Sequence, residues 1–426
     1  MTMTFDRIEY FLLDPSGVER GKWAPGKSID AVHREAITFP LSLTGLDIWG
    51  REVPETGLHI ETGDRDGVCS VVPGSVAPMP WLDGNPAEAM LEMRQADGSP
   101  FYANSRNCVA DAVAGLAELG LSATVAAELE FHLTDPKAER PAEPVERQDM
   151  YDLRALAAAR PVLDEIRQSA EIQNVPADTV ISEASADQFE VNLKHRNDAL
   201  AAADDAVRLR RIIRGAAAKF GLEATFMAKP FADRPGNGLH LHVSLVDQEG
   251  RNLFGETPDG TQKLAHAAGG LLETMGDGML VFANTWNGFR RFEPGSYAPN
   301  RLNWGEDNRS VAVRIPRSGP EARRFEHRIA GADANPYLVM ALVLQGARRG
   351  VIQAIDPPPP SNGNAYEGEA PMLGRDMGAA IDRFSGSPFI REALGSELQA
   401  HLVAVKRQEC AVFEGHISRF ELDTYR

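Results

Sequence analysis

Hydrophobic and polar residues alternate along five short segments in the C-terminal three quarters of the chain. In each segment one set of alternate positions is mainly apolar, whereas the other carries carboxylate, imidazole, amide or guanidinium groups. Strict alternation is typical of a β-strand, because successive side chains point to opposite sides of the sheet. The five segments read AELEFHL, ADQFEVNL, LHLHVSL, SVAVRIP and RRFEHRI. We therefore predict a sheet with one face packed against helices and one polar face.

A second periodicity predicts the helices that lie between these strands. Apolar residues recur at intervals of three and four, which is the spacing of one face of a helix. The strongest segments are 151–172, 197–219, 261–282, 335–354 and 395–413. The stretch 356–371 begins with Asp356 and four consecutive prolines. Proline lacks an amide donor and fixes φ, so we predict that this stretch is a surface excursion.

The N-terminal quarter has a different pattern. Residues 7–100 alternate short β-like runs with turns rich in Gly, Pro and Asp, and contain one short helical candidate near 31–37. A polar segment at 96–106 separates this region from the helical pattern CVADAVAGLAELG. A chain of 426 residues also exceeds the usual size of a single hydrophobic core. We predict two domains, 1–104 and 105–426.

Composition and charge restrict the class of protein. The chain is 43% hydrophobic and 25% charged, as in ordinary globular proteins. Its net charge of −17 disfavours binding to nucleic acid or to an anionic membrane. Cys69, Cys108 and Cys410 have no CxxC spacing, which argues against a disulfide framework or a zinc–thiolate site. With no signal-peptide pattern and no long apolar run, we expect a cytoplasmic protein without a membrane segment.

The polar faces of the five strands carry side chains that bind metal ions and anions. Glu128 and Glu130 alternate on the first strand, so their carboxylates and the His132 ring share one face. The remaining polar positions are Glu183, Gln188, Glu190, Asn192, His240, His242, Ser244, Arg309, Arg314, Arg324, Glu326 and Arg328. Any one such strand is compatible with an ordinary solvated face. Five together indicate a concave site lined by these groups.

This lining suits one class of chemistry. Mg²⁺ and Mn²⁺ take oxygen ligands, with an occasional imidazole tolerated by Mn²⁺, and the absence of cysteine disfavours structural zinc. Guanidinium groups beside such ions indicate phosphate, because arginine forms paired bonds to phosphoryl oxygens. The residues themselves therefore predict metal-assisted phosphoryl transfer.

The same residues lie in motifs that resemble those of the glutamine synthetase family, in family order and over nearly the whole chain. The motifs are AAELEFHL, SEASADQFEVNL, TFMAKPFADRPGNGLHLHVSL, RRFEPGSYAP, DNRSVAVRIP and ARRFEHRIAGADANPYL. The resemblance implies an α+β fold, with an N-terminal β-grasp domain followed by a C-terminal catalytic half-barrel and surrounding helices. It also implies a homo-oligomer, a dodecamer of two hexameric rings, with each active site between one subunit's C-terminal domain and its neighbour's N-terminal domain.

The resemblance further implies roles for individual residues. One metal ion would be held by Glu130, Glu183 and Glu190. A second, nearer the ATP phosphates, would be held by Glu128, His240 and Glu326, and a third ion would arrive with nucleotide. The implied cofactors are thus two to three Mg²⁺ or Mn²⁺ ions per site. ATP, the co-substrate, would contact His242, Ser244, Arg309, Arg314 and Arg324, and glutamate would contact Gly236, Arg291 and Arg328.

In the family reaction the ATP γ-phosphoryl group passes to the side-chain carboxylate of glutamate, and an amine then attacks the γ-glutamyl phosphate. Arg309, Glu326 and Tyr297 occupy the catalytic positions implied for this chain. Metal ions and guanidinium groups spread the charge that develops in both steps.

Two departures from the family pattern concern the amine. Members that use ammonia carry a glutamate in a PGYEAP-like flap and an aspartate in an FDGSS-like N-terminal loop. Here the flap reads PGSYAP, with Tyr297 at the glutamate position, and the N-terminal loop reads FPLSLTGLDIWG, without that aspartate. Since these carboxylates bind ammonium and take its proton, their absence predicts a larger amine.

The segments DPSGVERGKW, LDIWG and ETGDRDGV resemble the branch of γ-glutamylpolyamine and other γ-glutamylamide synthetases, so a polyamine or alkylamine is the expected acceptor. Tyr297 and Trp49 are predicted to enclose its tail. Trp304 fits ordinary packing better. Glu321 and Pro235 replace a lysine and an asparagine of many members, which affects nucleotide and glutamate contacts there.

Three other classes of function are alternatives to this one. They are a true glutamine synthetase that uses ammonia, a guanidino kinase or glutamate–cysteine ligase with a related sheet, and a catalytically silent relative that acts as a sensor. The flap and the ARRFEHR strand argue against the second class. The complete set of metal-binding positions argues against a silent protein, in which such ligands are usually lost.

Overall fold

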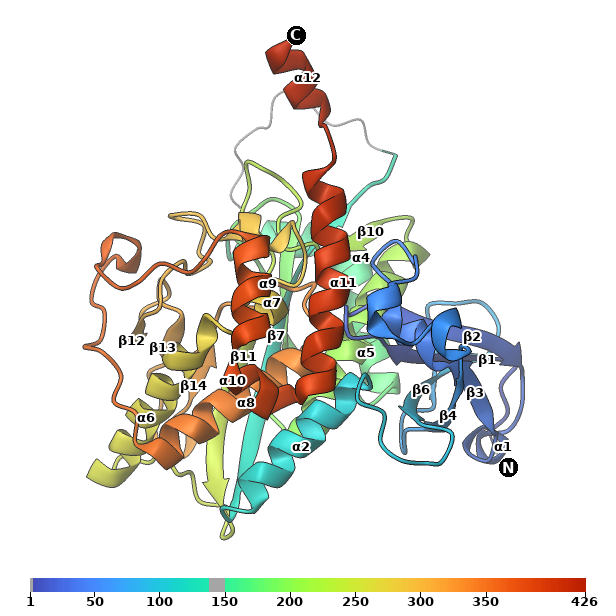
Figure 1. Cartoon of the computed structure of the whole chain (residues 1–426), viewed down its shortest axis with the longest axis horizontal. Helices are drawn as coiled ribbons and strands as arrows, with labels where there is room; N and C mark the ends of the chain where they lie inside the picture. Colours follow the sequence, from blue (N-terminus) through green and yellow to red (C-terminus); the bar gives the residue numbers. More distant parts are fainter. Residues whose placement is uncertain (1–2, 138–149) are drawn as a thin grey trace.

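The computed structural model describes residues 3–137 and 150–426, which form two sheets with surrounding helices (Figure 1). The first sheet has the strand order β2-β1-β6-β4-β3, with β5 paired to β6. Its strands are β1 (Arg7–Leu13), β2 (Glu19–Pro25), β3 (Ile37–Pro40), β4 (Asp66–Val71), β5 (Ala77–Pro78) and β6 (Pro86–Arg94).

The N-terminal sheet is mixed and has its own core. β1 and β6 run parallel at its centre, whereas the other pairs are antiparallel. Ile8 and Tyr10 of β1 are fully buried in this core together with Val32 of helix α1 (Ile29–His33). The short helix expected near 31–37 is therefore present, slightly earlier in the chain, and begins after the N-cap Ser28. A mixed sheet with one small helix fits the expected β-grasp domain.

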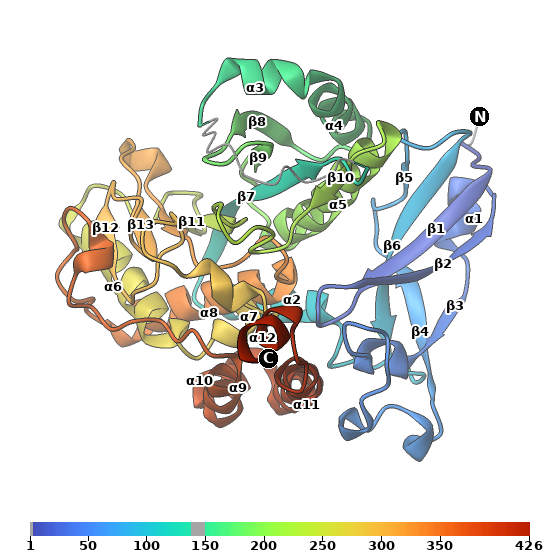
Figure 2. The same ribbon diagram turned by 90° about the horizontal axis from the view of Figure 1, so that it is seen from above.

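The second sheet has the order β12-β13-β14-β11-β7-β9-β8, with β10 paired to β7. All its pairs are antiparallel except β12 and β13. Figure 2 shows this sheet curling into a half-barrel, beside the N-terminal sheet. Its strands are β7 (Leu121–Thr134), β8 (Ala177–Ser182), β9 (Gln188–Leu193), β10 (Glu223–Thr225), β11 (Leu239–Asp247), β12 (Trp304–Glu306), β13 (Val313–Ile315) and β14 (Phe325–His327).

The long central strand β7 separates the helical layer from the concave face. Val125, Leu129 and Phe131 are fully buried on one side, whereas the alternate positions Glu128 and Glu130 are only half-buried. Helices α2 (Ser105–Ala117) and α5 (Ala199–Lys219) pack against the apolar side. The predicted two-faced strand is thus confirmed, and the catalytic half-barrel of the family is present.

Most of the remaining helices follow the predicted segments, with two breaks. Segment 151–172 forms two helices because Pro161 has no amide donor and its ring opposes the preceding turn, so a second helix starts at Arg160. Segment 261–282 is interrupted after Met275, where two glycines flank Asp277. The remaining helices are α3 (Leu153–Ala158), α4 (Arg160–Ile172), α6 (Pro258–Met275), α7 (Met279–Phe282), α8 (Pro336–Gln353), α9 (Met377–Gly386), α10 (Pro388–Leu394), α11 (Ser396–Glu414) and α12 (Arg419–Tyr425). Of these, α9, α10 and α12 lie outside the predicted segments.

Two surface features lie outside this packed body. The proline-rich stretch 356–371 is irregular apart from one short 3-10 turn, Ala365–Glu367, as expected. The C-terminal helix α12 projects away from the other elements (Figure 1), and Phe420 and Tyr425 on it are exposed. Among the helices of residues 3–137 and 150–426, none combines the length and apolar character that a bilayer crossing requires.

Helix α5 joins the two sheets through a buried arginine. The Arg211 guanidinium group, 7% exposed, donates from Nε to Glu88 of β6 at 2.7 Å. It also bonds Glu9 of β1 and Glu19 of β2. Arg214, one turn further along, forms a more exposed pair with Glu19 at 3.0 Å. These bonds fix the N-terminal sheet against the catalytic domain.

Candidate active site

Strand register places the predicted metal-binding residues side by side. Glu128 of β7 lies opposite His240 of β11, and Glu130 lies opposite Glu190 of β9. On the other side of β11, strand β14 contributes Glu326. Because directly opposite residues in a sheet point to the same face, the five side chains converge from four strands.

This face lines a cavity of about 1170 Å³. Its wall contains most of the residues that the sequence singled out, while Glu326 is buried at 1% exposure among them. The predicted residues in the wall are Glu128, Glu130, Glu183, Glu190, Gly236, His240, His242, Ser244, Arg291, Tyr297, Arg309, Arg314, Arg324 and Arg328. Pro235 and Glu321, the two replaced family positions, line it too.

The described residues form two groups with the geometry of a metal site. The first comprises Glu128, His240 and Glu326, and the second comprises Glu130, Glu190 and His240; within each, the possible ligand atoms lie within 4.8 Å of one another. The first group is the predicted second triad. In the other, His240 takes the place expected for Glu183, which lines the same cavity outside this compact group. Their roles as ligands remain predictions.

Cationic neighbours stabilise the charged form of two carboxylates. Burial alone would raise the pKa of Glu128, but His242 and His240 more than offset this and hold it well below its usual value. Burial of Glu326 is likewise outweighed by Arg328, His242 and His240, which lower its pKa to about 2. Arg314 bonds Glu326 at 2.9 Å. Glu128 and Glu326 therefore stay ionised, and their carboxylate oxygens can serve as metal ligands.

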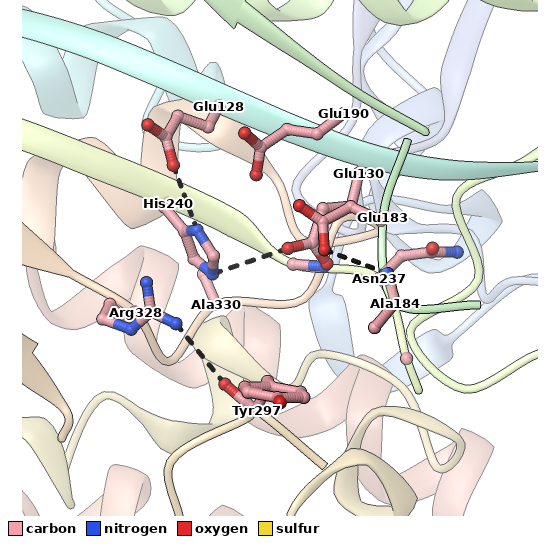
Figure 3. Close-up of polar contacts among 12 residues, drawn as sticks. Glu128, Glu130, Glu183, Ala184, Glu190, Asn237, His240, Tyr297, Arg328 and Ala330 are labelled. Atoms are coloured by element: carbon pink, nitrogen blue, oxygen red, sulfur yellow. Dashed lines mark hydrogen bonds and ion pairs between the residues drawn. The ribbon is translucent and has the colours of Figure 1, made fainter. Parts of the chain in front are cut away.

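The other carboxylates repel one another. Burial, reinforced by the charge of Glu130, raises the pKa of Glu183 to about 8. Burial and three neighbouring glutamates raise the pKa of Glu190 well above its usual value. His240 Nε2 is also buried without a hydrogen-bond partner among the described residues, and its contact with Glu130 Oε1 is long, at 3.9 Å (Figure 3). Crowded carboxylates with a spare imidazole nitrogen are a donor set that Mg²⁺ or Mn²⁺ fits, because a cation would relieve the repulsion.

The cavity wall from β12 to β14 carries the guanidinium groups of Arg309, Arg314, Arg317 and Arg324. Arg314 bonds Glu326 and also Asp307, at 3.0 Å. Arg324 Nε donates to His242 Nδ1 at 3.0 Å. Arg309 lies in the turn between β12 and β13 and lines the cavity. The pattern placed Arg324 and Arg328 inside a strand, but β14 covers only the three residues between them. Each arginine therefore flanks the strand.

The opposite part of the wall contains the predicted glutamate-binding groups. Arg291 is buried and donates from Nη1 to the carbonyl of Ile329 at 2.8 Å. Arg328 bonds Glu326, and its Nη2 donates to the carbonyl of Tyr297 at 3.5 Å (Figure 3). Arg328 thus links a predicted metal ligand to the flap.

Tyr297 lies on the cavity wall with half of its side chain exposed. Its φ of +58° is in the left-handed region, which costs a residue with a side chain roughly 1–2 kcal/mol. Such a conformation persists where surrounding contacts determine it and is typical of functional sites.

The structure places the two tryptophans away from this wall. Trp49 packs against Phe413 of α11, with ring centroids 5.4 Å apart, and is 45% exposed. Within one chain it lies outside the cavity-lining residues. Trp304 donates its indole N–H to the carbonyl of Pro358 at 2.6 Å and packs against the core.

Two features of the site were not predicted. His132 shares the face of Glu130, but its ring is fully buried and bonds Asn237 at 2.9 Å instead of lining the cavity. Tyr151 lines the cavity with a φ of +58°, like Tyr297. The surroundings of His132 and the position of Tyr151 depend on loops beside the sheet. Strand periodicity does not predict where such loops lie.

Known proteins share these features. The profile of the glutamine synthetase catalytic domain matches residues 102–425. The chain is 34% identical to gamma-glutamylputrescine synthetase of Escherichia coli K12, covering 98% of this chain and 90% of that protein. It is 30% identical to gamma-glutamylethanolamide synthetase of Streptomyces coelicolor (82% and 77%) and 30% identical to a glutamate–isopropylamine ligase of a Pseudomonas species (99% and 95%).

A solved structure described as a GmaS/ADP complex superposes with a TM-score of 0.86 and 25% identity, covering 99% of this chain and 96% of that one. The relatives include both glutamine synthetases and ligases whose names specify putrescine, ethanolamide or isopropylamine. The matched catalytic domain and the relatives together establish that the chain belongs to the glutamine synthetase family.

Proposed function

We propose that the protein uses ATP to join the γ-carboxylate of glutamate to an alkylamine or polyamine rather than to ammonia, through a γ-glutamyl phosphate. Family membership supports ATP-dependent ligation of glutamate. The choice of amine rests on one observation: the flap position that carries a glutamate in ammonia-using members is Tyr297, a half-exposed phenol on the cavity wall.

Glutamate binds with its α-carboxylate against Arg291 and Arg328 and its side chain directed towards the carboxylate cluster. Both guanidinium groups are buried and already positioned by bonds to the protein, so little ordering is required on binding. Gly236 lies beside Arg291, and the protein's own packing requires a glycine there, since a Cβ would lie 2.1 Å from the carbonyl oxygen of Ala228 and 3.0 Å from Arg291 Cγ.

The ATP phosphates lie between the metal groups and the arginines. Mg²⁺ or Mn²⁺ would be held by Glu128, Glu130, Glu190 and His240, with Glu183 and Glu326, and would supply positive charge against the negative charge of the phosphate oxygens. Arg309, Arg314 and Arg324 act on the same oxygens, while His242 and Ser244 lie on the nucleotide side of β11.

The acceptor site excludes ammonium by lacking an acid at the flap. Ammonium requires carboxylates that bind it and remove a proton, and the Tyr297 side chain offers a phenol in place of a carboxylate. The aromatic rings of Tyr297 and Tyr151 instead offer an apolar wall for an alkyl chain and faces for a distal ammonium group.

Assembly into rings forms part of the proposal. Trp49 is exposed on the N-terminal domain, where it would complete the acceptor pocket of an adjacent subunit. The exposed apolar residues on the projecting helix α12, among them Phe420 and Tyr425, fit burial against another copy. A dodecamer of two hexameric rings is the proposed assembly.

The decisive test compares amines in the wild type and in Tyr297→Glu. Phosphate release and amide formation are measured with Mg²⁺ or Mn²⁺, glutamate and ATP, using ammonium, ethanolamine, isopropylamine, putrescine and spermidine. The added carboxylate should raise the ratio of kcat/KM for ammonium to that for the best alkylamine by about tenfold, as expected for a new charged contact.

Tyr297→Phe is the matched control, because it keeps the ring and adds no acid. It should leave the ammonium-to-amine ratio nearly unchanged. A wild type that turns over ammonium best, or a Tyr297→Glu variant with the wild-type ratio, contradicts the assignment of the amine. A wild type that forms no amide with any acceptor at saturating metal contradicts the ligase proposal itself.

A further inference from the structure

The proline-rich arm, residues 356–375, runs alongside the chain that follows the flap. The Leu302 amide donates to the carbonyl of Pro371, and the Leu373 amide donates to the carbonyl of Asn300, both at 2.8 Å. Backbone pairing therefore holds an otherwise irregular surface segment against one wall of the active site. The prolines of the arm, at 357–360 and 371, have a fixed φ, whereas the proline-free part between them is held by hydrogen bonds.

The middle of the arm reaches the flap, residues 293–299. The Tyr366 hydroxyl donates to the carbonyl of Ala298, the residue after Tyr297, at 3.2 Å. Arg301 secures Tyr366 in turn, since its Nε donates to the Tyr366 carbonyl at 2.9 Å and its Nη1 to the carbonyl of Ala370 at 2.7 Å. The tyrosine is thus held by its own backbone while its side chain supports the flap.

These contacts act where the flap backbone is strained. The left-handed conformation of Tyr297 requires restraint on both sides. On the preceding side, Ser296 Oγ donates to the carbonyl of Glu293 at 2.7 Å. On the following side the restraint is Tyr366. At Tyr297 itself, the described residues contribute one long hydrogen bond, from Arg328 at 3.5 Å.

The same arm also contacts the turn that carries Arg309. Asn308 Nδ2 donates to the carbonyl of Gly363 at 2.9 Å, and Ser310 Oγ accepts the amide of Ala365 at 3.0 Å. These residues flank Arg309 on both sides. One short segment, residues 363–366, therefore contacts both the flap and the turn that carries Arg309.

The Tyr366 phenol stays a hydrogen-bond donor at neutral pH. Burial raises the pKa of Tyr366, and the nearby guanidinium groups of Arg328 and Arg291 act in the opposite direction without reversing the shift. The closeness of these cations also places the ring beside the glutamate-binding arginines.

We infer that Tyr366 is a positioning residue: from the proline-rich arm it fixes the flap over the acceptor site, so that the amine rather than water reaches the γ-glutamyl phosphate. This inference rests on the proposed function and adds a residue outside the cavity wall. In the competing reaction, water oxygen bonds the γ-carbonyl carbon, the carbon–oxygen bond to phosphate breaks, and glutamate, phosphate and a proton are released. ATP is then consumed without formation of amide.

Tyr366→Phe removes only the hydroxyl group and keeps the ring. With the best amine acceptor, phosphate released per amide formed should rise from near one, and the KM for the amine should rise about fivefold, the factor that one neutral hydrogen bond typically contributes. The KM for ATP should stay close to that of the wild type. A general loss of structure would instead lower kcat for every substrate without changing the phosphate-to-amide ratio.

Amide hydrogen exchange of residues 293–299, measured without substrates, tests the contact independently of the reaction. Exchange in the flap should be faster in Tyr366→Phe than in the wild type. Tyr425→Phe, which alters a phenol 86% exposed on α12, is the matched control and should change neither exchange nor the ratio.

The outcomes separate the two proposals. Two results with Tyr366→Phe would overturn the positioning role. One is faster flap exchange while the phosphate-to-amide ratio and the KM for the amine stay unchanged. The other is flap exchange that is no faster than in the wild type. If the wild type forms no amide with any amine, the proposed function fails, whereas the exchange experiment still decides whether Tyr366 restrains the flap.

Discussion

Two buried groups of carboxylates in this protein differ in how their charge is balanced. At the domain interface, Glu9, Glu19 and Glu88 surround Arg211, and further cations lie beside them in Arg208 and Arg214. In the catalytic cavity, among the described residues, Glu326 alone of the five clustered glutamates forms ion pairs with guanidinium groups. The others face histidines or one another.

The difference separates a structural cluster from a functional one. Three carboxylates matched by guanidinium groups offset the cost of desolvation within the protein and hold two sheets together. An excess of buried carboxylates is unfavourable by itself and is retained where a cation is to be bound. The following predictions test this contrast.

The largest expected effect follows from removing Arg211, the cation at the centre of the domain-interface cluster. Arg211→Ala leaves Glu88, which is fully buried, without its closest cation, and should lower the free energy of unfolding by about 3–5 kcal/mol in urea titrations. Arg214→Ala, on the same helix but half-exposed, is the control and should cost less than about 1 kcal/mol. Equal losses of unfolding free energy in the two variants would show that the buried Arg211 and the half-exposed Arg214 contribute alike.

In the cavity cluster, where most glutamates have no guanidinium partner among the described residues, one substitution should lower the activity and raise the stability of the metal-free protein. Glu130→Gln keeps the shape and the bond from the Gly238 amide, at 2.6 Å, but removes one charge. Amide formation should fall about 100-fold in a coupled ADP assay. In the presence of a chelator the variant should melt at a higher temperature than the wild type, because repulsion among the carboxylates is reduced.

Metal ions should reverse that order of stability. At a concentration 100 times its Kd, Mg²⁺ or Mn²⁺ should stabilise the wild type by about 2.7 kcal/mol, and Glu130→Gln by less. A variant less stable than the wild type in chelator would show that repulsion is not the dominant effect at this position.

The smallest effect concerns a neutral buried group at the domain interface. His401 of α11 bonds the carbonyl of Thr44 at 3.0 Å, and burial lowers its pKa to about 4. Above pH 6.5 the ring is neutral in both folded and unfolded chains, so it has no effect on pH dependence. As pH falls from 6.5 towards 4, the unfolded chain binds the proton first, and stability is lost.

This histidine should therefore contribute a loss of about 2 kcal/mol between pH 6.5 and pH 5, at 1.36 kcal/mol per pH unit. His401→Gln keeps a side chain that can bond Thr44 but cannot titrate. Urea titrations at pH 7 and pH 5 should show a smaller loss for the variant. The same loss in both proteins would assign the pH dependence to other groups.

Strand periodicity predicted much of the site because the site is built on strands. Glu128 and Glu130 could be placed on one polar face of β7 from alternation alone. What alternation could not supply was register between strands: whether Glu128 meets His240 depends on where β11 begins, which the intervening chain does not encode locally. The motifs resembling the glutamine synthetase family supplied that information.

Residues contributed by loops could not be predicted in the same way. His132 has the same strand position as Glu130, yet the loop carrying Asn237 covers it and turns it into a buried hydrogen-bond partner. Tyr366 lies in a stretch recognised only as unable to form a helix or a central strand. Its bond to the flap joins residues 68 positions apart and has no periodic signature.

Residues on strands and residues on loops differ in the kinds of mutation that they tolerate. Deleting one codon within β7 would reverse the facing of every later side chain in the strand, turning carboxylates into the core, so this part of the gene can vary only by substitution. The flap and the proline-rich arm are loops, and among the described residues the arm meets the sheet only at its edge, where the Ser361 amide donates to the Trp304 carbonyl of β12 at 2.8 Å. Surface loops accept changes in length more readily than a central strand. A lineage can therefore acquire a new acceptor by remodelling two loops while inheriting its phosphoryl-transfer chemistry intact.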